Sequence, residues 1–303
     1  MPLSQLVSLQ SQLLMLFNKL SDIKKGILSI IASAFFFALM ALFIKLAGDI
    51  PTLQKCFFRN FFAMILAFVA LIKAGESFKP GKGNVKYLVA RSVAGGLGMI
   101  CNFYAVDHCK SIADSSILNK LSPFFAIVFS AIILKEVANK YEWLAVIVAF
   151  IGTVFVVKPG AGLSSFPALI GAIGGMLAGL AYTFVRKLGM RKEKGMIIVA
   201  FFSVFTTVSL LPFVIINYTP MTINQWIFLC LTGISAAFGQ VFITKAYSFA
   251  PARKISVYDF SIVIFSAILG FAFIGQVPDY LSVIGYVIII GTAVWQWYKN
   301  SSN

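Results

Sequence analysis

Residues 27–46, ILSIIASAFFFALMALFIKL, form an almost unbroken apolar run with one charged residue, Lys45. A helix that crosses the hydrocarbon layer of a membrane takes about 20 residues, and this run has that length. Lys24 and Lys25 precede the run, as they would in a signal peptide, but the apolar stretch is too long and no small-residue cleavage site follows it. The sequence therefore predicts a retained transmembrane helix at this position.

The rest of the chain repeats this apolar pattern. Of its 303 residues, 60% are hydrophobic and 12% are charged, and the mean hydropathy is +0.93. Soluble domains are about half apolar and one quarter charged, so this composition excludes a soluble globular enzyme. We predict an all-α integral membrane protein. Its ten predicted transmembrane helices are 25–46, 53–73, 86–106, 112–134, 140–157, 166–187, 196–216, 224–246, 254–275 and 280–298.

The basic residues lie in short clusters between the apolar runs and give a formal net charge of +15. If the N-terminus is placed in the cytoplasm, 17 Lys and Arg residues fall in cytoplasmic loops and 4 fall in loops on the other side. Cytoplasmic loops are enriched in Lys and Arg. We therefore predict a multi-pass protein of the plasma (bacterial inner) membrane with both termini cytoplasmic. The same clustering argues against nucleic-acid binding.

Two segments about 140 residues apart resemble each other, IVAFIGTVFVVKPG at 147–160 and VIIIGTAVWQWYKN at 287–300. The repeat corresponds to five helices, and an odd number of helices places the second copy upside down relative to the first. We therefore expect two inverted five-helix repeats, 24–160 and 161–300, after a cytoplasmic or interfacial segment, 1–23. The alternative is that apolar helices resemble one another by composition alone.

The chain resembles the drug/metabolite transporter superfamily, and within it the family built from two EamA repeats. The resemblance covers about residues 24–298. It rests on Arg59 in FFRNFF (57–62), NFYAVDH (102–108), LNKLSPFFAIVFSAIILKE (118–136), GTVFVVKPG (152–160) and SVYDFSIVIFSAILGFAFIGQVPDYLSVIGYVIIIGT (256–292). The second copy departs from the family pattern, with Gln276 where a Glu is common and Val263 where the repeat would place a proline.

The resemblance implies a bacterial-type carrier with ten helices and both termini inside. The leading hypothesis is a secondary transporter that moves a small metabolite, such as an amino acid, a vitamin or a nucleoside-like compound, by alternating access. An intramembrane enzyme and a non-transporting sensor or scaffold are the alternatives. The enzyme would need a nucleophile with its base, or paired carboxylates, at recognisable spacing, and neither is present. We expect no catalytic residues, no metal site and no cofactor. The expected partners are a small-molecule substrate and the lipid bilayer, and a homodimer is left open.

Polar residues inside the predicted spans mark the candidate substrate site, because ionisable groups in a membrane need a partner or a function. Lys120 is the leading candidate. It is expected near the centre of its helix, just before Pro123, which frees a backbone carbonyl. An ion pair of Lys120 with Asp259 or Asp114 is as consistent with the sequence as direct substrate contact. The candidate site residues are Asn102, Tyr104, Asn119, Lys120, Tyr182, Gln240, Thr244, Tyr258 and Asp259.

Other polar or small residues are weaker candidates. Arg91 lies near the cytoplasmic end of its predicted helix, where its side chain can reach the membrane surface, and Arg59 lies near the outer end of its own. Arg186 is expected to be solvated. The sixth predicted helix carries glycines at four-residue spacing, Gly171, Gly175 and Gly179, which is typical of close helix packing.

Overall fold

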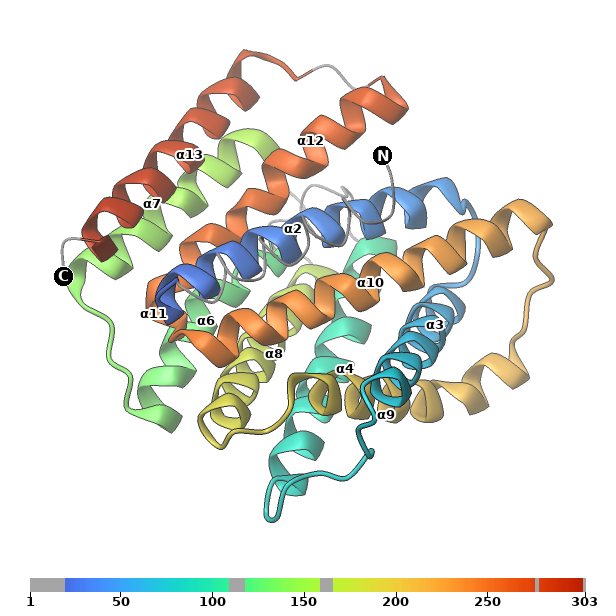
Figure 1. The fold of residues 1–303 in the computed structure, drawn as a ribbon. Coiled ribbons are helices and arrows are strands. Elements are labelled where there is room, and N and C mark those ends of the chain that lie inside the picture. Colours follow the sequence, from blue (N-terminus) through green and yellow to red (C-terminus); the bar gives the residue numbers. More distant parts are fainter. Residues whose placement is uncertain (1–19, 109–117, 159–165, 276–277, 302–303) are drawn as a thin grey trace, which may run out of the picture.

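The computed structural model describes residues 20–108, 118–158, 166–275 and 278–301, and these ranges contain helices and no strand (Figure 1). The first half contains α2 (Asp22–Leu46), α3 (Thr52–Lys73), α4 (Val85–His108), α6 (Ser122–Phe129) with a π-helical continuation (Ser130–Leu134), and α7 (Lys140–Val157). The second half contains α8 (Phe166–Met190), α9 (Gly195–Ile216), α10 (Ile223–Phe249), α11 (Ala252–Ile255), a 3₁₀ helix (Ser256–Phe260), α12 (Ser261–Ile274) and α13 (Tyr280–Ser301). The all-α prediction is confirmed.

Eight helices in the described ranges are long and apolar enough to cross a membrane. The segment Ser122–Leu134 is a shorter apolar helix, because a turn at Lys120 and Leu121 precedes it. The expected start of the fourth span falls in residues 109–117, outside the described ranges. If segments that follow one another without a loop count as one helix, the described ranges hold ten helices. The chain is therefore an integral membrane protein, and most of the expected boundaries agree to within a few residues.

The helices of the two halves interleave instead of forming two separate bundles. In the first half, α2 packs along α10, α4 along α8, α3 along α9 and α7 along α13, and each of these partners belongs to the second half (Figure 1). The α6 helix also contacts the 3₁₀ helix that precedes α12. Each half thus packs mainly against helices of the other half.

The glycines of α8 make this packing close. A Cβ atom added at Gly174 would lie 3.0 Å from the backbone nitrogen of Asn102 in α4. A Cβ atom at Gly175 would lie 2.5 Å from the carbonyl oxygen of Leu118, and one at Gly179 would lie 2.7 Å from Phe125 Cβ. The prediction that these glycines serve close helix packing is confirmed.

The loops meet in two separate sets at the two ends of the bundle. At the end that the charge pattern predicts to be cytoplasmic, the Glu193 carboxylate accepts hydrogen bonds from the Gly81 amide at 3.0 Å and from Asn84 Nδ2 at 2.7 Å. At the other end, the Gln54 side-chain amide is hydrogen-bonded to the backbone of Thr219, at 2.8 and 2.9 Å. Lys158 pairs with Asp279 at that same end.

Candidate functional site

Two helices are interrupted at matching places in the two halves. Residues 118–119 are helical, Lys120 and Leu121 form a turn, and α6 begins at Ser122 with Pro123 in its first turn. Proline is tolerated there because the first helical N–H groups need no partner within the helix. In the second half, the 3₁₀ helix Ser256–Phe260 separates α11 from α12. Lys120 therefore lies at a turn inside the predicted span 112–134, next to the proline that indicated a disturbance of the helix.

An ion pair joins the two interruptions. Lys120 Nζ lies 3.7 Å from Asp259 Oδ2, and the two side chains are only 14% and 9% exposed. This confirms one of the two pairings that the sequence left open, whereas Asp114 lies outside the described residues. A charge buried this deeply requires a partner, and each of these two residues is the counter-ion of the other.

A pair of stacked tyrosines lies beside the ion pair. The rings of Tyr182 in α8 and Tyr247 in α10 have centroids 4.8 Å apart and planes 11° apart. Both tyrosines interact electrostatically with Asp259. Two helices of the second half, α8 and α10, thus bring a pair of aromatic rings to the ion pair. Asp259 comes from the 3₁₀ helix of the same half, and Lys120 comes from the first half.

The remaining predicted residues are distributed around this centre. Gln240 and Thr244 are buried on α10, where they precede Tyr247 by about two turns and one turn. The Thr244 hydroxyl has no hydrogen-bond partner among the described residues. Asn119 lies next to Lys120 and is half-buried.

Three other predicted residues are placed elsewhere. Asn102 packs against Gly174 where α4 crosses α8. The Tyr104 side chain is 36% exposed. Tyr258 is buried, and its hydroxyl faces Asn300 at the end of α13 and not the ion pair. The structure therefore brings Lys120, Asp259 and Tyr182 together and leaves these three at the periphery.

Two arginines that the sequence ranked low belong to the same region. Arg91 is 2% exposed and Arg59 is 8% exposed, so neither side chain reaches the surface. The expectation that Arg91 extends to the membrane surface was wrong, because its guanidinium group instead stacks on the Phe202 ring at 3.7 Å. Both arginines interact electrostatically with Tyr182. The presence of a charge inside a span was the signal that could have identified them.

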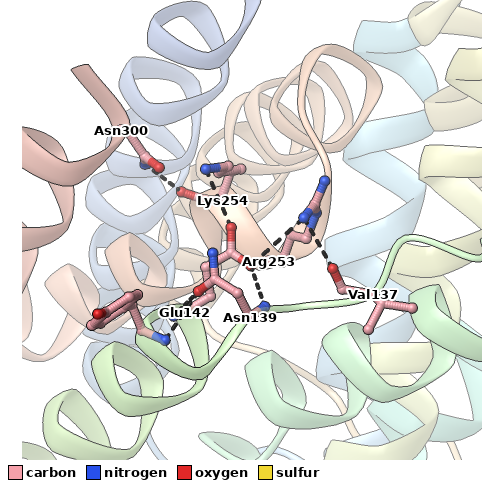
Figure 2. A network of polar contacts seen from close by, with 7 residues as sticks. Val137, Asn139, Glu142, Arg253, Lys254 and Asn300 are labelled. Atoms are coloured by element: carbon pink, nitrogen blue, oxygen red, sulfur yellow. Dashed lines mark hydrogen bonds and ion pairs between the residues drawn. The ribbon is translucent and has the colours of Figure 1, made fainter. Parts of the chain in front are cut away.

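A second polar cluster ties the helix ends together at the predicted cytoplasmic side (Figure 2). Asn139 and Glu142 form a capping box at the start of α7. Glu142 is only 2% exposed, and its carboxylate also pairs with Lys254 at 3.3 Å and with Arg253 at 3.8 Å. Arg253 donates to the Val137 carbonyl at 2.9 Å. This cluster links the loop before α7 to the start of α11.

A neighbouring ion pair corrects another expectation. Arg186 in α8 pairs with Glu136 at 2.9 Å, and both side chains are 15% exposed. Arg186 also donates to the Ser248 carbonyl at 3.1 Å. The prediction that Arg186 is solvated was wrong, because Glu136 from the other half lies within reach.

Comparison with known proteins assigns this architecture. The sequence matches the EamA-like transporter family over residues 24–158 and 166–296, which is most of the chain. The chain belongs to the EamA-like transporter family. It is 32% identical over 271 residues to the pseudopaline exporter CntI of Pseudomonas aeruginosa strain UCBPP-PA14, covering 88% of this chain and 94% of that relative. It is also 27% identical over 298 residues to human solute carrier family 35 member G1, covering 91% of this chain and 80% of that protein.

The fold is shared with a solved structure. One crystal structure superimposes with a TM-score of 0.77 at 16% sequence identity, covering 89% of this chain and 95% of that one. At this identity the likeness shows the fold alone. The family and the relatives' names indicate that this EamA protein is a membrane transporter and not an enzyme. Its buried polar cluster is accordingly interpreted as a candidate transport site.

Proposed function

We propose that this chain is a secondary transporter that carries a small metabolite across the plasma membrane by alternating access. The substrate site is the region around the Lys120–Asp259 ion pair and the Tyr182–Tyr247 stack. The observation that carries the proposal is the ion pair itself. Its Nζ and Oδ2 atoms are 3.7 Å apart, and it joins two helix interruptions, one from each half. Interrupted helices that meet near the middle of a membrane present polar groups to substrates in secondary transporters.

The helix pairing supports an inverted repeat. If the five helices of one half are exchanged for the corresponding helices of the other, α2 with α10 becomes α8 with α4, and both pairs occur. The pairs α3 with α9 and α7 with α13 are each converted into themselves. This invariance is what a pseudo-two-fold axis between the halves produces. The interrupted fourth and ninth helices obey the same exchange.

The loop contacts support the proposed topology, with both termini in the cytoplasm. Loops that the charge pattern places inside interact with one another, as in the Lys194–Glu76 ion pair at 3.0 Å. The Lys158–Asp279 pair instead joins two loops that the charge pattern places outside. The excess of basic residues on the first set then assigns it to the cytoplasm.

Alternating access requires that contacts between the halves break at one end while they form at the other. At the proposed cytoplasmic end, three glutamates each bind a residue of the other half: Glu136, Glu142 and Glu193. These glutamates are largely buried, with exposed fractions between 2% and 15%. At the outer end, the Lys158 and Asp279 side chains are 38% and 50% exposed. The buried carboxylate contacts between the halves therefore lie at the inner end, and substrate release into the cytoplasm requires these contacts to open.

Reconstitution tests the proposal. Purified protein in proteoliposomes should exchange a labelled amino acid, vitamin or nucleoside from a panel, in counterflow, with saturation. Lys120→Met should abolish this flux. Lys245→Met is the matched control, because Lys245 is an exposed lysine of α10 outside the cluster. Flux of no compound across a broad panel would contradict the proposed activity. Equal flux in the Lys120→Met and Lys245→Met variants would contradict the proposed site. An uncoupler separates proton-driven transport from exchange.

A further inference from the structure

The interior of the described bundle carries more positive than negative charge. Arg59, Arg91 and Lys120 are buried or nearly buried there, and Asp259 pairs with Lys120. The other buried carboxylates, those of Glu142 and Glu193, lie at the helix ends with polar partners of their own. Among the described side chains, the transport region therefore has two cations that no carboxylate neutralises.

Arg91 shows this deficit most directly. Its residue is 2% exposed, and its Nε and Nη1 atoms have no hydrogen-bond partner among the described residues. The ring of Phe202 covers one face of the guanidinium group at 3.7 Å. A Cβ atom at Gly95, one turn further along α4, would lie 2.8 Å from Arg91 Nη1. Glycine at position 95 thus leaves room for a guanidinium group whose Nε and Nη1 donors are unused.

Arg59 has neutral partners instead of a counter-ion. Its Nε donates to the Met40 sulfur at 3.2 Å, and its Nη1 lies 3.1 Å from Asn60 Oδ1 and 3.6 Å from the Met99 sulfur. Met99 is one turn beyond Gly95 on α4, so the two arginines approach the same face of this helix. They also interact electrostatically with each other, and both interact with Tyr182.

We propose that the transported molecule is an organic anion whose carboxylate groups bind between Arg59 and Arg91, next to the Tyr182–Tyr247 stack. An uncompensated buried charge destabilises a protein, and a bound anion supplies the missing counter-ion. The planar guanidinium fork matches a carboxylate with two parallel hydrogen bonds. The inference rests on the proposed transport function and adds the substrate class to it.

Thermal unfolding of the purified full-length protein tests the substrate class. The probes are citrate and succinate, their neutral amides, inorganic phosphate, glucose 6-phosphate and putrescine, each compared with chloride at equal ionic strength. The carboxylates should raise the unfolding midpoint, and the amides and putrescine should not. Stabilisation by the phosphates but not the carboxylates, or by no anion at all, would overturn the carboxylate assignment.

Variants connect the effect to the two arginines. Arg91→Lys keeps the positive charge and removes the planar guanidinium group. It should raise the half-saturating carboxylate concentration by roughly tenfold, because one charge-assisted hydrogen bond is lost. Gly95→Ala, which displaces the guanidinium group, should weaken binding in the same direction. Lys245→Met should leave binding unchanged. Unaltered carboxylate binding in both the Arg91→Lys and the Gly95→Ala variants would refute the proposed site.

Transport assays distinguish failure of this inference from failure of the proposed function. Counterflow of neutral or cationic compounds, without counterflow of carboxylates, would refute the anion assignment and leave the transporter proposal standing. Binding of carboxylates without flux of any compound would refute the transport proposal and leave the binding site standing.

Discussion

Replacing Lys120 by methionine and Asp259 by asparagine, singly and together, separates the structural from the transport role of the central ion pair. At an effective dielectric constant of about 20, unit charges 3.7 Å apart attract each other by about 4 kcal/mol. A single replacement loses this attraction and leaves the other group charged and buried, so each should destabilise the protein by about 3–5 kcal/mol. The double replacement leaves no charge behind and should cost about 1–2 kcal/mol.

The assay combines equilibrium unfolding in mixed micelles with counterflow in proteoliposomes. The double variant is expected to be more stable than either single variant, which gives a coupling energy of at least about 4 kcal/mol. It is also expected to transport nothing, although it folds. Additive losses of stability would refute the coupling inferred from the 3.7 Å distance. A well-folded double variant with normal flux would show that the pair is purely structural.

Gly179→Ala should destabilise the protein by about 1–3 kcal/mol in the same unfolding assay, because the added Cβ atom would lie 2.7 Å from the Ala126 backbone nitrogen. Gly291→Ala is the control and should be neutral, because no atom lies within 4 Å of the added Cβ atom. The hydrogen bond from Lys158 lowers the pKa of Asp279 from 3.8 to about 2, so this carboxylate stabilises the folded state above pH 3.8 and the contribution is lost as the pH falls toward 2. Lys158→Met should raise the pKa of Asp279, measured by NMR, and an unchanged pKa would contradict the contact. Lys79 is exposed in a loop, and we expect a cysteine placed there, in a variant without the native cysteines, to be labelled from the cytoplasmic side only. Labelling from outside would overturn the orientation.

Hydropathy predicted most helices because the membrane imposes one requirement on every span. The run of about 20 apolar residues that opens the first span becomes α2, Asp22–Leu46, with no tertiary information needed. The pairing of Lys120 with Asp259 could also be proposed from sequence, because each charge inside a span requires a partner and few candidates exist.

Interruptions and side-chain directions could not be predicted in this way. Pro123 indicated a disturbance, but it begins α6 and does not bend a continuous helix. The 3₁₀ segment that carries Asp259 contains neither Gly nor Pro, so no local signal announces it. Arg91 lies six residues into α4, where sequence position favours an extended side chain at the surface, and only the placement of Phe202 in α9 explains its burial.

The coincidence of interruptions and charges at one place has a common physical cause. A helix break frees backbone groups, and an ionised side chain needs hydrogen bonds, and neither can be satisfied by lipid. Both are tolerated only where another part of the protein covers them, and here each half covers the interruption of the other. Lys120 and Asp259 come from opposite halves, so the pair exists only when the halves are in register. A change in their relative position necessarily alters this pair and the charge balance around Arg59 and Arg91. The contact that stabilises the fold is thus also the one that a moving substrate site must rearrange.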